Sequence, residues 1–69
     1  MTEHESFIAA AKAAVPGISK AEIGRRSGVS RSAIGKRAFN VQNAVKVWNS
    51  SGSPELCYIP ARVEPKDGA

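Results

Sequence analysis

The segment 18–39, I-S-K-A-E-I-G-R-R-S-G-V-S-R-S-A-I-G-K-R-A-F, carries the helix start and stop signals that most narrow the fold of this chain. Ser19 and Glu22 have the spacing of a capping box, in which each side chain binds a free backbone amide of the other residue. Gly28 falls where this helix must end, because glycine adopts the left-handed conformation without a steric penalty. The pattern predicts a short helix that begins after Ser19 and ends at Gly28.

A second helix follows after a turn of about three residues, a length typical of a helix-turn-helix. Ser30 is a favourable cap for this helix, whose body runs from Arg31 to a point between Lys36 and Phe39. We expect Phe39 to join the core, so that the helix ends before it. In DNA-binding proteins with this motif, the second helix lies in the major groove of the duplex. The motif therefore predicts double-stranded DNA as the partner.

The outward face of the second helix is the predicted base-reading surface. At about 100° per residue, Arg31, Ser32, Gly35 and Lys36 share this face. Arginine and lysine can donate two hydrogen bonds to guanine, and serine can bind several bases. Gly35 makes no contact of its own but allows the helix backbone to approach the DNA closely.

Basic residues concentrate in the middle of the chain. Between residues 6 and 54 there are eight lysines and arginines but one carboxylate, Glu22, and the other acids lie near the ends. A basic centre of this kind is the electrostatic footprint of phosphate binding. The alternative is a solvated helix surface that happens to be basic and binds no nucleic acid. The helix-turn-helix favours the DNA interpretation.

Ahead of the motif, an apolar stripe predicts a further helix that supports the other two. Thr2 and Glu5 have the spacing of a capping box at its start, and the Pro-Gly pair at 16–17 ends it. The stripe consists of Phe7, Ile8, Ala11, Ala14 and Val15.

The C-terminal half has two interpretations. The segments 44–48, A-V-K-V-W, and 55–59, E-L-C-Y-I, are rich in β-formers and separated by N-S-S-G-S-P, which predicts an antiparallel β-hairpin. The fold class is then α+β, with three N-terminal helices that contain the helix-turn-helix, followed by the hairpin. The competing pattern is helical, with Asn40 as cap, and would give an all-α fold of five short helices. Its apolar positions are Val41, Ala44, Val45 and Trp48.

Length and composition set further limits. A chain of 69 residues makes one small domain, predicted to span 1–64 and to be followed by a frayed tail, 65–69. The lone cysteine, Cys57, cannot form an internal disulfide, which favours a reducing cytoplasm, and we expect it half-buried in a strand. No apolar run approaches the roughly 20 residues of a membrane span, and the N-terminus lacks the pattern of a signal peptide.

The motif resembles that of a known family. The pattern G-V-x-x-S-A-I-x-K, formed by Gly28, Val29, Ser32, Ala33, Ile34 and Lys36, is similar to the helix-turn-helix of the Cro repressors of lambdoid phages. The resemblance extends over about residues 20–63, and N-S-S-G-S resembles the hairpin turn of the family. It implies an α+β repressor that binds a near-palindromic operator as a dimer. It also implies that Arg31, Ser32 and Lys36 read bases while Ser30 and the Lys20 amide lie near phosphates.

Three positions depart from the family pattern. Ser27 stands where the family often has a larger apolar residue, and Lys66 stands where an aromatic side chain joins the partner subunit. Arg37 falls on the face of the second helix that should be buried, and we expect its long side chain to reach a phosphate. The predicted phosphate contacts are Ser19, Lys20, Arg25, Ser30 and Arg37. The predicted dimer interface, formed by edge strands that pair across a two-fold axis, consists of Tyr58, Ile59 and Val63.

These observations predict a repressor of phage or prophage type that blocks polymerase by occupying DNA. The alternative is an accessory subunit, such as an antitoxin or an excisionase, that acts through a protein partner. One histidine and one cysteine without neighbouring paired carboxylates provide no visible nucleophile, base or metal site. We therefore expect no enzyme activity, no cofactor, no metal and no small-molecule substrate.

Overall fold

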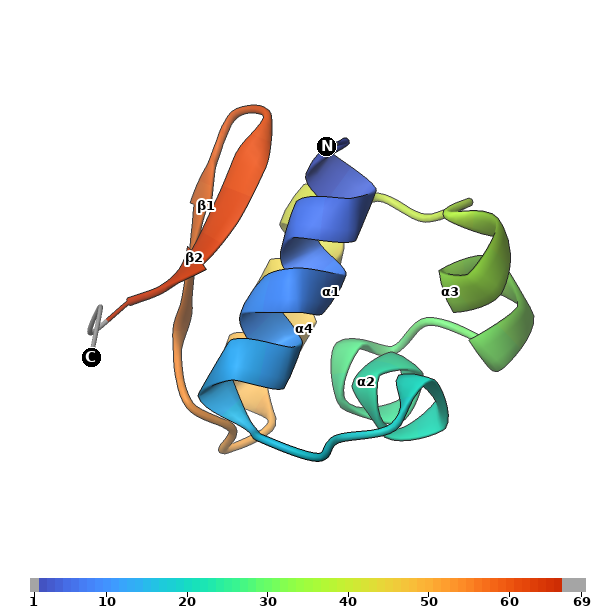
Figure 1. Ribbon diagram of the computed structural model, residues 1–69, viewed down its shortest axis with the longest axis horizontal. Helices are drawn as coiled ribbons and strands as arrows, with labels where there is room; N and C mark the ends of the chain where they lie inside the picture. Colours follow the sequence, from blue (N-terminus) through green and yellow to red (C-terminus); the bar gives the residue numbers. More distant parts are fainter. Residues whose placement is uncertain (1, 67–69) are drawn as a thin grey trace.

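The computed structural model describes residues 2–66, which form four helices followed by a two-stranded antiparallel sheet (Figure 1). This arrangement confirms the predicted α+β class with a C-terminal hairpin. The elements are α1 (Glu3–Ala14), α2 (Lys20–Ser27), α3 (Arg31–Lys36), α4 (Val41–Ser50), β1 (Leu56–Ile59) and β2 (Arg62–Pro65).

A helix begins at each of the two predicted capping boxes, although only the first box forms completely. The Thr2 hydroxyl accepts the Glu5 N–H at 3.2 Å, and the Thr2 N–H donates to the Glu5 carboxylate at 3.0 Å. The Ser19 hydroxyl accepts the Glu22 N–H at 3.2 Å. The Glu22 carboxylate does not complete this box, because it binds Arg26 instead.

The turn between α2 and α3 follows the sequence signals. Gly28 has a φ of 70°, in the left-handed region, and Ser30 caps α3 by accepting a backbone N–H at 3.1 Å. Helix α3 ends at Lys36, since Arg37 also adopts a left-handed conformation. Phe39 lies beyond the helix, where it packs half-buried against the core, as predicted.

The predicted strand at 44–48 is wrong, because this segment belongs to helix α4. Asn40 caps the helix by accepting a backbone N–H at 2.9 Å. The four apolar positions at helical spacing are all buried: Val41, Ala44, Val45 and Trp48. Burial of this continuous face outweighs the local β-preference of its valines. The chain therefore has a fourth helix rather than a strand before the hairpin.

The hairpin lies later in the chain than predicted. Its strands pair in the register Leu56↔Pro65, Cys57↔Glu64, Tyr58↔Val63 and Ile59↔Arg62. In N-S-S-G-S-P, Asn49 and Ser50 are the last residues of α4 and residues 51–54 lead towards β1, so this segment is not the hairpin turn. Cys57 is exposed rather than half-buried.

The predicted frayed tail, 65–69, begins too early. Pro65 belongs to β2, and the Lys66 N–H donates to the Glu55 carbonyl at 2.9 Å, which extends the pairing past the strand ends. The remaining three positions of that prediction, 67–69, lie outside the described residues.

Helix α4 lies behind α1 at the centre of the view in Figure 1, with α2 and α3 on one side and the hairpin on the other. The fully buried rings of Phe7 and Trp48 meet edge to face at 6.2 Å between centroids.

The hairpin is held against the helices by two polar side chains, Ser6 of α1 and Asn49 of α4. The Ser6 hydroxyl accepts the Val63 N–H at 2.8 Å and donates to the Val63 carbonyl at 3.1 Å. Asn49 makes the corresponding pair of bonds with Leu56, at 2.8 and 3.0 Å.

Gly24 sets how closely α2 approaches the turn that leads into α3. Its carbonyl accepts the Val29 N–H at 2.8 Å. A Cβ atom at this position would overlap the Val29 carbonyl oxygen and lie 3.3 Å from the Ile34 side chain. The helix-turn-helix in this form therefore requires a residue without a side chain at position 24.

We expect Gly24→Val to lower the free energy of unfolding by about 1–3 kcal/mol, because the added side chain must displace backbone. The control is Gly35→Val, since a Cβ at the exposed Gly35 meets no atom of the described chain within 4 Å. This control should change stability by less than about 0.5 kcal/mol. Chemical denaturation of both variants measures the difference, and equal stability losses would contradict the steric role of Gly24.

Candidate nucleic-acid interface

The four residues predicted to read bases are all exposed on α3, while Ile34 on the opposite face is 1% exposed. Within residues 2–66, no carboxylate lies within 4.0 Å of Arg31 or Lys36, and the side chains of Arg31, Ser32 and Lys36 make no hydrogen bond. All of their donor groups remain available to a partner. The structure thus gives α3 an outer face that is positively charged and uncommitted.

The predicted phosphate contacts on α2 and α3 are also exposed. Ser19 and Ser30 each cap a helix by accepting one backbone N–H, so each hydroxyl hydrogen is still free to be donated. Lys20 begins α2 and has no carboxylate partner in the described part of the chain. These groups flank the start of each helix of the helix-turn-helix.

Arg25 and Arg26 are neighbours on α2 with different roles. The Glu22 carboxylate binds both, at 3.3 Å from Arg25 and 3.0 Å from Arg26. The hydrogen bond from Arg26 is the main reason why the pKa of Glu22 lies below its ordinary value. The Arg25 side chain is 81% exposed and can reach an external anion.

Arg26 turns back onto the fold. Its guanidinium lies over the Trp48 ring at 5.8 Å from the centroid and donates to the Ser53 hydroxyl at 3.2 Å. Arg26 therefore ties α2 to α4 and to the segment that follows α4.

Arg37 does not lie on the buried face of α3, which corrects the sequence prediction. Its left-handed conformation ends the helix and turns the side chain outward, where its guanidinium lies 3.3 Å from the Glu5 carboxylate. The N–H of Thr2 is the main cause that holds the pKa of Glu5 below its ordinary value, and Arg37 adds to the effect. Arg37 is thus a surface cation whose side chain is 52% exposed.

The predicted dimer interface is only partly available. Val63 is 4% exposed and belongs to the core of the single chain, so its assignment to the interface is wrong. Its strand lies against α1, to which Ser6 binds it. Tyr58 and Ile59 are half-buried and retain some exposed surface.

The outer edge of β1 has unpaired backbone groups at Tyr58, within the part of the chain that the structure describes. Because the N–H and carbonyl of Val63 bind Ser6, the Tyr58–Val63 pair is of the non-hydrogen-bonded type, and the backbone groups of Tyr58 also point away from the hairpin. Asn49 covers the same edge at Leu56. In residues 2–66, by contrast, no group binds the Tyr58 backbone.

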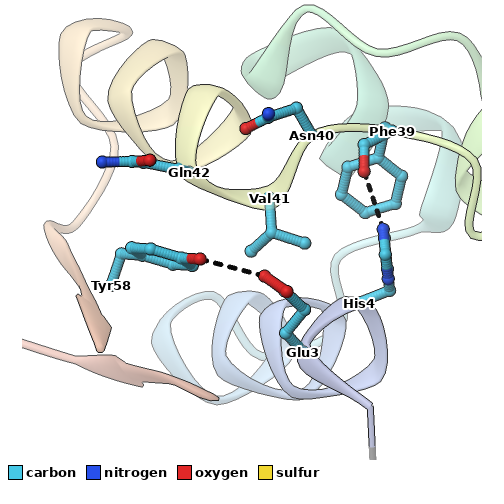
Figure 2. Close-up of a pocket in the computed structure, with 7 residues that line it drawn as sticks. All are labelled: Glu3, His4, Phe39, Asn40, Val41, Gln42 and Tyr58. Carbon is cyan, nitrogen blue, oxygen red and sulfur yellow. Dashed lines mark hydrogen bonds between the residues drawn. The ribbon is translucent and has the colours of Figure 1, made fainter. Parts of the chain in front are cut away.

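A polar cavity of about 240 Å³ lies where the start of α1 meets the start of α4 and β1 (Figure 2). The Tyr58 hydroxyl donates to the Glu3 carboxylate at 3.0 Å, which raises the pKa of Tyr58 above its ordinary value. His4 Nε2 lies 2.7 Å from the Phe39 carbonyl, and the two rings meet edge to face at 4.9 Å. These bonds join the start of α1 to β1 and to the segment between α3 and α4.

In the part of the chain that the structure describes, no three His, Cys, Asp or Glu side chains lie close enough together to hold a metal ion. No helix among residues 2–66 combines the length and the apolar character that a membrane crossing needs. Comparison with known protein families, curated proteins and solved structures finds no match for this chain.

The different surroundings of the two α2 arginines give a testable difference. We expect Arg26→Ala to lower the free energy of unfolding by about 1 kcal/mol, because it removes the contact with Trp48 and two side-chain hydrogen bonds. Arg25→Ala should change it by less than about 0.5 kcal/mol, because its ion pair is exposed. Thermal and chemical denaturation measure both. Equal losses would show that Arg26 does not anchor α2.

Proposed function

We propose that this chain is a sequence-specific DNA-binding repressor of the Cro type, which occupies a near-palindromic operator and blocks RNA polymerase. The observation that carries this proposal is the outer face of α3, on which Arg31, Ser32 and Lys36 are exposed and uncommitted within the described residues. Charged side chains on a surface normally pair with carboxylates when these are near, but none is near Arg31 or Lys36 in residues 2–66. Their proposed partner is the DNA major groove, whose base edges match these donors.

The surrounding surface is suited to position α3. Lys20 and Ser19 stand at the start of α2, where free backbone N–H groups and the helix dipole favour a phosphate. Arg25 projects from the same helix, and Ser30 and Arg37 stand at the two ends of α3. These residues bind the DNA backbone and fix the register in which α3 enters the groove.

The proposed repressor acts as a homodimer in the cytoplasm of a bacterial host, by binding alone and without a chemical step. Tyr58 and Ile59 form the dimer contact through the open edge of β1, where two copies of the strand pair antiparallel across a two-fold axis. This interface replaces the one that included Val63.

Selection of bound duplexes from a random-sequence library, at near-physiological salt, tests this function. We expect enrichment of an inverted repeat whose half-site centres are about one helical turn apart. Salt-sensitive binding without enrichment would contradict base reading and would favour an accessory subunit that acts through a protein partner.

The same selection with Arg31→Ala tests the reading face. This variant should lose about 1–3 kcal/mol of binding free energy on the selected site and lose the preference at one base pair. Arg25→Ala is the matched control, because it should weaken binding to every duplex alike and reduce the salt slope by about one unit. Uniform weakening by Arg31→Ala would make Arg31 a phosphate contact instead.

The open edge of β1 predicts a backbone-specific effect on the dimer. Tyr58→Pro removes the outward N–H and should reduce the dimer fraction in sedimentation equilibrium and on an operator duplex. Tyr58→Phe is the control, since it loses the hydroxyl bond to Glu3 but keeps this N–H, and it should retain the dimer. A dimer that survives both substitutions would show that the contact lies elsewhere.

A further inference from the structure

A second hollow, of about 270 Å³, lies between α1, the start of α2 and the end of α3. Three cations line it, and each comes from a different segment: Lys12 from α1, Lys20 from α2 and Arg37 from the C-cap of α3. We refer to it as the α1–α2 groove, and its complete lining is Glu5, Ile8, Ala9, Lys12, Lys20 and Arg37.

The charges of this groove are not balanced. Within residues 2–66, neither Lys12 nor Lys20 has a carboxylate within 4.0 Å, and Arg37 has only Glu5, at 3.3 Å. Three positive charges therefore face one negative charge across a hollow whose wall includes the apolar side chains of Ile8 and Ala9. A low-dielectric wall strengthens the field of such a cluster, which favours an anion in the hollow.

The position of the groove identifies that anion. Arg37 directly follows α3, and Lys20 begins α2, so the groove adjoins the helix-turn-helix surface. On the proposed function, a DNA strand that borders the major groove occupied by α3 passes beside both residues.

We propose that the α1–α2 groove holds a phosphate of the DNA backbone, that Lys12 on α1 binds this phosphate, and that Glu5 competes with it for Arg37. The inference rests on the proposed function and extends the DNA interface to α1. The DNA phosphate must then displace the Glu5 carboxylate from Arg37. Glu5 thereby weakens binding to every sequence.

Glu5 is well placed to compete, because it is held in position for another reason. Its carboxylate accepts the Thr2 N–H at 3.0 Å as part of the capping box of α1. Glutamine can fill the same capping role without the charge. Glu5→Gln therefore removes the competing charge and leaves the cap in place.

The salt dependence of binding to a random-sequence duplex tests the role of Lys12. Lys12→Ala should weaken binding and reduce the slope of log affinity against log salt by about one unit. The control is Lys66→Ala, which removes the same charge from the position directly after β2, where the ammonium lies 3.2 Å from the Glu55 carboxylate. The hairpin lies on the other side of α1 from α2 and α3 (Figure 1). Lys66→Ala should keep the wild-type slope. A wild-type slope for Lys12→Ala, or an equal loss in both variants, would overturn the proposal.

Glu5→Gln tests the competition in the opposite direction. It should bind all duplexes about 1.5- to 5-fold more tightly than the wild type, the range expected from release of an exposed ion pair. Unchanged or weaker binding by this variant would overturn the role of Glu5.

Two further outcomes separate the possible failures. A wild-type protein that binds no duplex would overturn the proposed function and the inference with it, whereas loss of the Lys12 effect alone would overturn only the groove. Titration with inorganic phosphate, followed by NMR, distinguishes the two sources of the anion. If Lys12→Ala loses free phosphate binding but retains the wild-type slope on DNA, the groove is a site for a free anion and its assignment to DNA is overturned.

Discussion

The fold depends on the burial of one side chain, Trp48. Its ring is fully buried, meets Phe7 of α1 edge to face and carries the Arg26 guanidinium of α2 on its surface. Its indole N–H donates to the Pro54 carbonyl at 2.7 Å, which fixes the path from α4 to β1. One residue thus joins three helices and the start of the hairpin. A strand at 44–48 could not bury Ala44, Val45 and Trp48 on one face, because alternate side chains of a strand point to opposite faces.

The outer face of α3 depends on packing that the helix itself cannot provide. A helix of six residues is too short to be stable alone, so its conformation is set by its caps and by the buried Ile34. Gly24 allows the turn to approach α2 closely enough for Ile34 to reach the core. The exposed donors of α3 are therefore presented by a rigid support, which reduces the entropy lost when they bind a partner.

Local signals made much of this structure predictable. Caps at Thr2, Ser19 and Ser30 and the left-handed Gly28 act within one turn, and all four appear where the sequence placed them. Predictions that required long-range contacts were less successful. The buried position of Val63 depends on Ser6, which lies 57 residues away. The choice between helix and strand at 44–48 depended on a complete buried face, while the local β-preference of the same residues pointed the other way. The requirement for glycine at position 24 arises only once α2 and the turn are side by side.

Within residues 2–66, the carboxylates near the helix-turn-helix contact residues that hold the fold together, and they leave the outer face of α3 free. Glu22 holds Arg26 against Trp48, and Glu5 caps α1 while it engages Arg37. Both acids lie beside cations that flank α3, and neither lies within 4.0 Å of Arg31 or Lys36 in the described chain. Negative charge near the flanking cations lowers the attraction to phosphates that every DNA sequence shares. The base contacts that we propose for α3 are not weakened in this way. On the proposed function, the carboxylates lower specific and non-specific affinity by the same factor, so the ratio between them, which decides whether a small repressor finds its operator among competing sites, depends on the base contacts of α3.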